Sequence, residues 1–301
     1  MSITCYLLSP RGFCSGVSRA VNMAEQIVKL YGTVYVVEDI IHNKTFMNSM
    51  VKKGIVKVPS IDDVPNGAAV MFSAHGTPPQ VLEKAEKREL TIVDSTCPVV
   101  KAIQNEIAKE AEAGKKIVII GNRAHAEILA FLGSASETDV FVVYSEIDVD
   151  LLDDFTGNEV VYFTQTTLDH VHVQSIVNRL KEKVPHIKSN SQNNICYATK
   201  ERQDVVRHIA GSTDLMIIVG SSHSSNAKRL REVALDSGAK NVVLIDSKNE
   251  LEDSVFNGVE TAAITAAAST PEEVVQELVC YLEDKLGIIF SDFKLPNEDG
   301  E

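Results

Sequence analysis

The sequence predicts an α/β protein built from three similar units with mostly parallel sheets. Short β-branched apolar runs alternate with amphipathic stretches along all 301 residues. The runs are continuously apolar rather than alternating, which is typical of strands that helices cover on both faces. One spacing of cysteine and histidine also recurs three times along the chain. Together these patterns favour parallel strands joined by right-handed helical crossovers.

The predicted elements follow from these runs in chain order. Apolar, β-branched segments predict strands at 33–37, 69–73, 91–94, 116–120, 140–144, 160–164, 215–219, 242–245 and 261–265. Amphipathic segments between them predict helices at 18–31, 79–88, 99–113, 169–183, 199–210, 226–236 and 271–285. Several of the strands end in polar residues or glycine, and these ends are where α/β sheets usually bind ligands.

An internal repeat divides the chain into three. Each repeat runs from a cysteine through a helix and a strand to a histidine. The spacing is 28 from Cys14 to His42, 28 from Cys97 to His125, and 27 from Cys196 to His223. A further strand with a small polar end follows each histidine. We therefore expect units at 15–97, at 98–194, and at 195–285 together with 1–14, in a pseudo-three-fold arrangement. The stretch 286–301 is expected to be a polar C-terminal tail that is frayed over Ser291–Glu301.

Composition limits the possible partners. Lys plus Arg number 29 and Asp plus Glu 42, so the net charge is −13. A chain this acidic is poorly suited to nucleic acid or to an anionic membrane surface. No window approaches 18 consecutive apolar residues, and the N-terminal residues lack a basic leader. Five scattered cysteines do not form a disulfide framework. We expect a cytoplasmic protein in a reducing compartment, with no nucleic acid and no membrane as partner.

Three cysteines stand where each repeat begins, directly before a predicted helix. Such a position favours the thiolate, which is the form that ligates metal. In a three-fold arrangement Cys14, Cys97 and Cys196 would converge and could bind zinc or three irons of a 4Fe–4S cluster. Three separate buried thiols are the alternative. The other two cysteines, Cys5 in an apolar strand-like run and Cys280 on the last helix, are expected to fill the core.

Neutral polar side chains follow the predicted strands and suit a phosphate or diphosphate ligand. They are His42, His75, His125, Thr166, Thr167, Ser224, Ser225, Asn226 and Ser269. Taken singly, each hydroxyl or amide could be a helix cap, and each histidine a structural residue. Glu127 lies two residues after His125 and could carry protons, or could simply begin a helix. A P-loop is absent from the sequence, and no convincing dinucleotide motif occurs.

These blocks resemble, in order, the LytB/IspH family of 4-hydroxy-3-methylbut-2-enyl diphosphate reductases. The resemblance covers residue 10 to about 285. The matching blocks are Arg11-Gly12-Phe13-Cys14-Ser15-Gly16-Val17, Ile41-His42-Asn43, Phe72-Ser73-Ala74-His75-Gly76, Asp94-Ser95-Thr96-Cys97-Pro98, His125-Ala126-Glu127, Thr164-Gln165-Thr166-Thr167-Leu168, Ile195-Cys196-Tyr197-Ala198-Thr199, 220–226 and 265–271.

The resemblance implies a trefoil of three α/β units around one 4Fe–4S cluster, with Cys14, Cys97 and Cys196 as its ligands. It implies that His42, His75, His125, Thr166, Ser224, Ser225, Asn226 and Ser269 bind the diphosphate substrate. The substrate hydroxyl would bind the iron that has no cysteine, and Glu127, acting with Thr166, would supply protons. The implied products are isopentenyl and dimethylallyl diphosphate, in the last step of the non-mevalonate isoprenoid pathway. Electrons would come from a ferredoxin- or flavodoxin-type protein.

The sequence departs from the family pattern at a few positions. Ala126 stands where the family commonly has proline, Asn194 where it has aspartate, and Ala267 where it has glycine. His223 stands where asparagine is usual, and no substrate role is carried onto it. Two other functions would use the same cysteines: an iron–sulfur sensor, which would not need Glu127, and a zinc hydrolase, which would be colourless.

Overall fold

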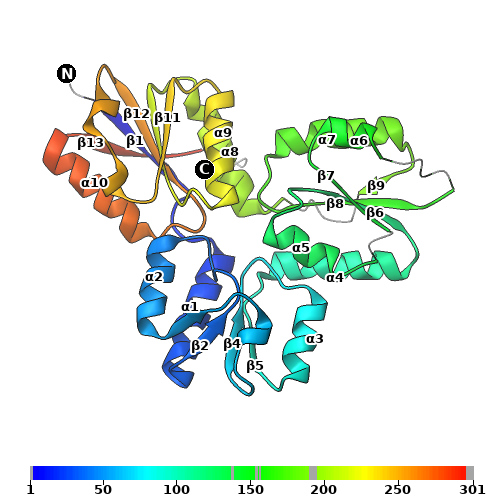
Figure 1. Cartoon of the computed structure of the whole chain (residues 1–301). Helices are drawn as coiled ribbons and strands as arrows, with labels where there is room; N and C mark the ends of the chain where they lie inside the picture. Colours follow the sequence, from blue (N-terminus) through cyan, green and yellow to red (C-terminus); the bar gives the residue numbers. More distant parts are fainter. Residues whose placement is uncertain (1–2, 137–138, 153–154, 156, 190–194, 296–301) are drawn as a thin grey trace. The chain divides into compact units, whose positions relative to one another are not determined.

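The structure is a computed structural model that describes residues 3–136, 139–152, 155, 157–189 and 195–295. Its strands form three sheets, of five, four and four strands, and every strand pairing is parallel. Helices lie between the strands along the chain (Figure 1). The predicted α/β class with three parallel-sheet units is therefore confirmed.

The first sheet has the strand order β3-β2-β4-β5. Its strands are β2 (Val34–Val36), β3 (Ile55–Lys57), β4 (Ala69–Phe72) and β5 (Thr91–Asp94), and its helices are α1 (Ser15–Tyr31), α2 (Lys44–Lys53), α3 (Pro79–Lys87) and the short 3-10 helix η1 (Ile61–Asp63). α1 buries Ala20, Ala24 and Val28, which repeat every four residues on one face. Val70 and Phe72 of β4 pack with Ala85 of α3 in a separate cluster.

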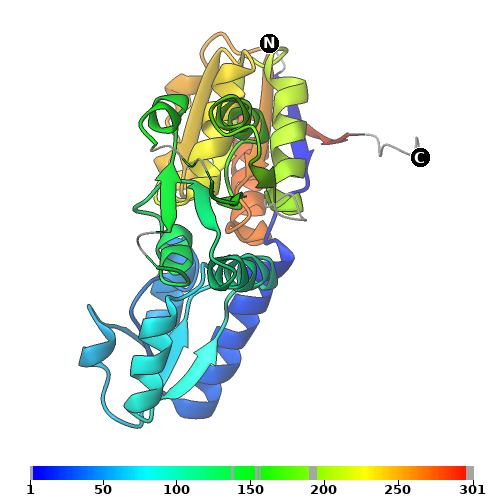
Figure 2. The same ribbon diagram turned by 90° about the vertical axis from the view of Figure 1, so that its right-hand side faces the viewer.

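The second sheet has the order β7-β6-β8-β9. Its strands are β6 (Lys116–Ile120), β7 (Val140–Val143), β8 (Val160–Thr164) and β9 (Lys188–Ser189), and its helices are α4 (Pro98–Glu112), α5 (Ala126–Leu132), α6 (Glu146–Asp150) and α7 (His170–Lys183). Alternate residues of β6 enter two cores. Val118 and Ile120 pack with α6 and α7, whereas Ile117 and Ile119 pack with α4 and α5. In the ribbon diagram α6 and α7 lie on one side of this sheet, and α4 and α5 on the other (Figure 2). Helices thus cover both faces, as the continuously apolar strands predict.

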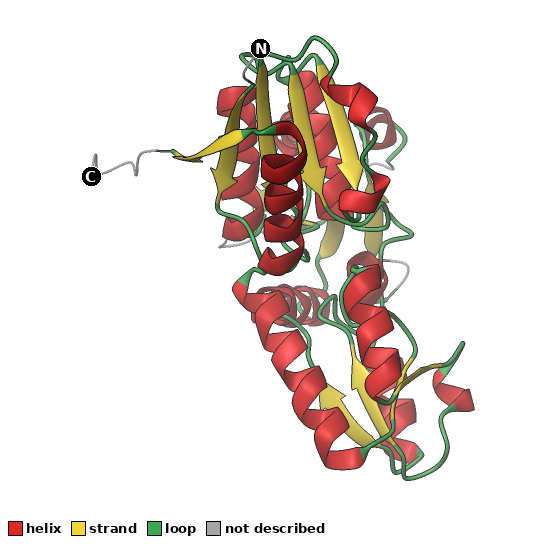
Figure 3. Ribbon diagram, turned by 90° about the vertical axis from the view of Figure 1, so that its left-hand side faces the viewer, coloured by secondary structure: helices red, strands yellow, loops and turns green. Residues whose placement is uncertain are grey.

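The third sheet combines the two ends of the chain in the order β11-β10-β12-β1-β13. Its strands are β1 (Thr4–Ser9), β10 (Leu215–Val219), β11 (Asn241–Ile245), β12 (Thr261–Ala266) and β13 (Ile289–Lys294), and its helices are α8 (Tyr197–Ala210), α9 (Ser225–Asp236), α10 (Glu272–Leu286) and the short 3-10 helices η2 (Lys248–Glu250) and η3 (Asp253–Phe256). α10 packs on one face of the sheet, whereas α8 and α9 pack on the other (Figure 3).

All three sheets share one winding. The strand after the cysteine's helix is β2, β6 or β10, and it lies inside the sheet. The next strand in the chain (β3, β7 or β11) pairs with it on one side and forms the edge of the sheet. The third strand (β4, β8 or β12) pairs with it on the opposite side. The chain therefore reverses direction across the sheet between these two inner strands. In open α/β sheets the carboxyl ends at such a switch point form the ligand site.

Contacts divide the chain into two compact units. One holds Met1–Ser15, His42–Lys44 and Tyr197–Glu301, and with them the five-stranded sheet. The other holds Gly16–Ile41 and Thr45–Cys196, and with them both four-stranded sheets. The predicted boundaries between the three units stay a prediction. No helix of the described part of the chain is long and apolar enough to cross a bilayer.

The prediction of a polar tail from residue 286 is wrong over Ile289–Lys294, which form β13 and pair in parallel with β1 (Figure 3). Its residues are largely exposed, so the segment reads as a tail from composition, but Phe290 and Phe293 pack against the core clusters. Backbone pairing with a neighbouring strand, which leaves no trace in polarity, holds this edge strand. The remainder, 296–301, lies outside the described residues.

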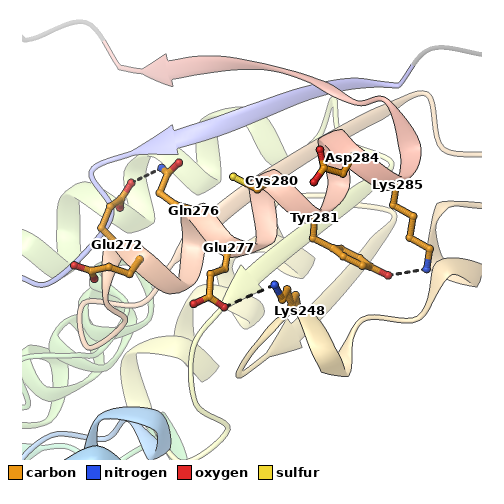
Figure 4. A pocket seen from close by; sticks show the side chains of 9 residues that line it. Lys248, Glu272, Gln276, Glu277, Cys280, Tyr281, Asp284 and Lys285 are labelled. Atoms are coloured by element: carbon orange, nitrogen blue, oxygen red, sulfur yellow. Dashed lines mark hydrogen bonds and ion pairs between the residues drawn. The ribbon is translucent and has the colours of Figure 1, made fainter.

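The prediction that Cys280 fills the core is also wrong, since this thiol is exposed on α10. It lies beside an open groove of about 730 Å³. Charged and polar side chains line this groove. Lys248 forms an ion pair with Glu277, and Lys285 donates a hydrogen bond to the Tyr281 hydroxyl (Figure 4). The face of α10 that packs on the sheet instead carries Val275, Leu278, Val279 and Leu282. Cys5 is buried as predicted, at 1% exposure, and burial raises the pKa of its thiol to about 12.

Candidate active site

The three repeat cysteines occupy equivalent places in the fold. Each stands directly before a helix: Cys14 before α1, Cys97 as the N-cap of α4, and Cys196 before α8. Each backbone N–H also donates to the carbonyl two residues beyond β12, β4 or β8. The acceptors are Ala74 for Cys97 at 3.0 Å, Thr166 for Cys196 at 3.0 Å, and Ala268 for Cys14 at 3.1 Å. The repeat therefore extends to individual hydrogen bonds at the switch-point edge of each sheet.

The surroundings of these thiols fit metal ligation. All three are partly exposed and none is in a disulfide. Gly16 lies against Cys97, where a Cβ on residue 16 would lie only 2.7 Å from the sulfur, so the glycine keeps space beside this thiol. Within the described residues, no three His, Cys, Asp or Glu side chains form a group that could hold a metal ion. A centre shared by Cys14, Cys97 and Cys196 therefore stays a prediction.

Glu127 and Thr166 form a buried pair in the second sheet. Glu127 lies in the first turn of α5 and is 1% exposed, and Thr166 follows β8. The Thr166 N–H donates to Glu127 Oε1 at 2.7 Å, and its hydroxyl donates to Oε2 at 2.9 Å. Burial raises the pKa of Glu127 to about 7, although both hydrogen bonds from Thr166 oppose the shift. The carboxyl group can therefore hold or release a proton near neutral pH.

His125 and His75 lie beside this pair. The Nδ1 atom of His125 caps α5 by accepting the Glu127 N–H at 3.2 Å. Only the neutral ring with its proton on Nε2 can accept at Nδ1, so this cap selects a tautomer with an Nε2–H donor. The rings of His75 and His125 meet edge to face, with centroids 5.8 Å apart. The histidine that follows β4 and the histidine that follows β6, which belong to different sheets, thus lie together beside the acid at the start of α5.

The polar residues of the third sheet gather at two of its strand ends. Ser224 caps α9, with its hydroxyl accepting the Ala227 N–H at 3.3 Å, and Ser225 is the first residue of that helix. Asn226 is 5% exposed, and both polar atoms of its side chain are buried without a hydrogen-bond partner among the described residues. An unpaired buried amide is costly unless a ligand satisfies it. The Ser269 hydroxyl donates to the His42 carbonyl oxygen at 3.2 Å, which joins two predicted site segments.

Two of the departures from the family pattern have a local explanation. Ala126 is the first residue of α5, where a backbone N–H has no partner within the helix, so alanine and proline are both compatible with the fold. Ala267 is wholly buried, and its methyl group points at Gly220, where an added Cβ would lie 2.9 Å away. Its methyl group therefore packs against the end of β10. Asn194 lies outside the described residues.

Sequence reasoning missed one contributor, Gln165. This residue is completely buried, and its side chain contacts both segments of the Glu127–Thr166 pair. It stands inside the block Thr164-Gln165-Thr166-Thr167, so the sequence located the residue, but it gave no sign of the partners of its side chain. The partner of its Oε1 atom, the backbone of Asn122, is 43 residues away in the chain.

Comparisons with known proteins agree on one family. A family model described as LytB protein matches residues 5–283. The chain is 40% identical over 281 residues to the 4-hydroxy-3-methylbut-2-enyl diphosphate reductase of Wigglesworthia glossinidia brevipalpis, covering 92% of this chain and 89% of the relative. It is 37% identical over 283 residues to the protein of that name from Psychrobacter arcticus, covering 93% and 89%.

Solved structures give the same result. The chain matches the E-1-hydroxy-2-methyl-but-2-enyl-4-diphosphate reductase from Plasmodium falciparum with a TM-score of 0.95 and 34% identity, over 100% of this chain and 95% of that chain. A second structure, of an (E)-4-hydroxy-3-methyl-but-2-enyl diphosphate reductase described as the terminal enzyme of the non-mevalonate pathway, matches with a TM-score of 0.65 and 28% identity. It covers 94% of this chain and 100% of that chain.

Proposed function

Because the chain belongs to the LytB family, we propose that it reductively dehydroxylates 4-hydroxy-3-methylbut-2-enyl diphosphate. The C–O bond to the hydroxyl group breaks, two electrons and two protons are consumed, and water leaves. The products are isopentenyl and dimethylallyl diphosphate. This is the chemistry of an oxidoreductase that ends the non-mevalonate isoprenoid pathway, and family membership makes it an iron–sulfur enzyme.

The observation that carries the proposal is the hydrogen-bonded series Glu127, Thr166 and Cys196. The acid accepts both hydrogen bonds of Thr166, and the Thr166 carbonyl accepts the N–H of Cys196 at 3.0 Å. A buried proton source and a candidate metal ligand are thus both hydrogen-bonded to Thr166. An iron–sulfur sensor has no need of such an acid, and a hydrolase has no need of a supply of electrons.

Cys14, Cys97 and Cys196 would hold one 4Fe–4S cluster. When bound, the cluster would pass two electrons from an electron-donor protein to the substrate, and its iron without a cysteine would act as a Lewis acid on the substrate hydroxyl. Two observations support a shared centre. The N–H groups of the three cysteines are held in equivalent ways, and Cys14 is only two residues before Gly16, which itself lies against Cys97. Two residues span about 7 Å at most.

The diphosphate would be held by donors at the switch-point ends of the strands. Ser224, Ser225 and Asn226 open a helix of 12 residues whose N-terminal dipole favours anions. The buried amide of Asn226 would gain the partner that it lacks. The same ligand would take donors from the other candidates, namely His42, His75, His125, Thr167 and Ser269. The net charge of the protein is −13, but hydrogen bonds from neutral donors to a charged phosphate are strong. Donors at strand ends can therefore bind a multiply charged anion without a basic surface.

Glu127 would hold the proton and Thr166 would orient it. The carboxyl pKa of about 7 leaves a substantial protonated fraction at neutral pH. Burial excludes water around the acid, so its proton is directed by the Thr166 hydroxyl and not lost to solvent. Loss of activity above pH 7, through ionisation of this acid, is the expected pH dependence.

The test is anaerobic purification followed by iron and sulfide analysis and a turnover assay with a reduced dye as electron donor. The reductase should be brown, carry about four irons and four sulfides, and consume the hydroxylated diphosphate. A protein with the cluster but without turnover would indicate the sensor. A colourless protein that holds zinc and cannot be reconstituted would contradict the cysteine assignment.

A further inference from the structure

We propose that Gln165 is a positioning residue whose buried amide joins the segments that carry Glu127 and Thr166 and so fixes the geometry of that pair. The inference deepens the proposed function, since it concerns the delivery of the proton in the same site. Gln165 directly follows β8 and is completely buried. Its own N–H donates to the Ile120 carbonyl at the end of β6, at 2.8 Å.

The amide bridges the two strand ends in a single orientation. Gln165 Oε1 accepts the Asn122 N–H at 3.1 Å, and Gln165 Nε2 donates to the Thr167 hydroxyl oxygen at 2.9 Å. A backbone N–H can only donate, so the oxygen must face Asn122 and the nitrogen must face Thr167. The side chain therefore cannot flip without losing the Asn122 bond.

Both ends of the bridge lead to the acid pair. On one side, the Asn122 carbonyl accepts the His125 N–H at 2.9 Å, and His125 in turn caps the helix that carries Glu127. On the other side, Gln165 and Thr167 flank Thr166 and hold its backbone. Thr166, which donates two hydrogen bonds to Glu127, is thus fixed by the residues directly before and after it. The short contacts between Glu127 and Thr166 depend on the span of this bridge.

The other two repeats show what the fold itself needs at this position. Ser73 and Ala267 are the residues that directly follow β4 and β12, as Gln165 follows β8. Ala267 packs against Gly220 as Gln165 packs against Gly121, where added Cβ atoms would lie 2.9 and 3.1 Å away. Serine and alanine therefore complete this turn in the other repeats. In the described residues a long amide stands here only in the unit that carries Glu127.

The test compares Gln165→Ser, which installs the residue of the first repeat, and Gln165→Met with a matched control, Gln104→Met. Gln104 is a second buried glutamine of the same compact unit. Its amide donates to the Thr77 carbonyl at 2.9 Å and to the Ala130 carbonyl at 3.2 Å, so it also contacts the helix that carries Glu127 but does not bond to Thr166 or its two neighbours. The control therefore also removes a buried glutamine amide that makes two hydrogen bonds. Thermal unfolding of all three variants gives the loss of stability that each substitution causes.

The first readout is amide hydrogen exchange of Thr166 in the metal-free protein, at conditions of equal stability. Both Gln165 variants should exchange this N–H at least about 10-fold faster than Gln104→Met, because its acceptor is no longer held. The second readout is turnover of the loaded enzyme. kcat should fall about 10- to 100-fold with KM within about 3-fold, since misplacing a reacting group acts on the chemical step.

Three outcomes would overturn the inference. One is Thr166 exchange and kcat equal to those of Gln104→Met, which would make the amide an ordinary structural bond. Another is a proportional rise in KM, which would place Gln165 in substrate binding. The third is failure of both Gln165 variants to fold, because a folding requirement is then the whole role. A wild-type protein without reductase activity would contradict the proposed function instead, and hydrogen exchange would still decide the role of Gln165.

Discussion

At the scale of single residues, Glu127 is the group whose chemistry depends most on its surroundings. Glu127→Gln keeps the size and an acceptor for the Thr166 N–H but cannot release a proton. Turnover should fall about 100- to 10,000-fold, while the affinity for isopentenyl diphosphate stays within about 3-fold. Steady-state kinetics and calorimetry with the cluster intact measure the two effects. Unchanged turnover would remove Glu127 from the proton path.

The same substitution carries a stability signature with a definite sign. The Glu127 pKa is raised from 4.5 to about 7 in the folded protein, so the wild type loses stability as pH rises from about 4.5 through about 7. Glutamine does not titrate. Glu127→Gln should therefore gain stability relative to wild type across this window, by roughly 3 kcal/mol at pH 8, and the difference should be independent of pH below 4.5. Urea unfolding at pH 4, 6 and 8 checks this; a difference that does not grow with pH would contradict the burial.

Asn226 is the residue at which binding and stability should oppose each other. Its buried amide has no protein partner among the described residues, so Asn226→Leu, of similar size, should raise the free energy of unfolding of the ligand-free protein by about 1–3 kcal/mol. Diphosphate affinity should fall at least about 10-fold. Denaturant unfolding and titration with isopentenyl diphosphate measure both. Loss of stability without loss of affinity would assign the amide to the fold.

Gly16 is the residue on which space beside a thiol depends. Gly16→Ala would place a Cβ 2.7 Å from the Cys97 sulfur, so the helix or the thiol must move. Iron content after reconstitution should fall to less than about half that of wild type, with circular dichroism unchanged. Gly211→Ala, whose added Cβ would lie 3.4 Å from the Ser237 carbonyl, is the control. Equal iron in both variants would show that Cys97 tolerates the methyl group.

At the scale of elements, the start of α5 shows how a departure from the family pattern can be neutral for the site. Ala126 is the first helical residue, where the ring of proline suits the helical φ and costs no intrahelical hydrogen bond. Ala126→Pro should raise the free energy of unfolding by about 0.4–1 kcal/mol, because it restricts the unfolded chain. Ala126→Gly should lower it by a similar amount. Turnover should hold in both; a destabilising proline would mean that the Ala126 N–H is needed.

At the scale of the whole molecule, the three-fold repeat makes a prediction about the cysteines. Each of Cys14, Cys97 and Cys196 precedes a helix and donates its N–H to an equivalent carbonyl, so replacing any one by serine should reduce bound iron by a similar factor. Cys280→Ser, at an exposed thiol, should leave iron content unchanged. Iron and sulfide analysis of the four variants decides. Full iron in one of the three serine variants would remove that cysteine from the shared centre.

Much of this architecture can be predicted from the sequence, because the patterns that produce the strands, helices and repeats are local or periodic. Continuous apolar runs locate buried strands such as β6 and β10, and helical periodicity locates α4 and α7 within one or two residues. The recurring distance from cysteine to histidine reveals the three units, since each cysteine stands at the same turn before a helix. The quoted blocks also contain the acid, Thr166, His75 and His125, which the structure brings together after β4, β6 and β8.

Other features were decided only by tertiary structure, because their causes lie far away in the chain. The edge strand β13 is polar and forms through backbone pairing with β1, about 280 residues earlier. Cys280 is exposed because packing on the sheet selects the opposite face of α10. The pKa of Glu127 is set by burial against residues of other elements, and the reach of Gln165 by a backbone group 43 residues away. Composition and spacing determine which residues are able to ligate a metal, bind an anion or transfer a proton. Long-range packing decides which of them are buried, which are hydrogen-bonded and which are held in place.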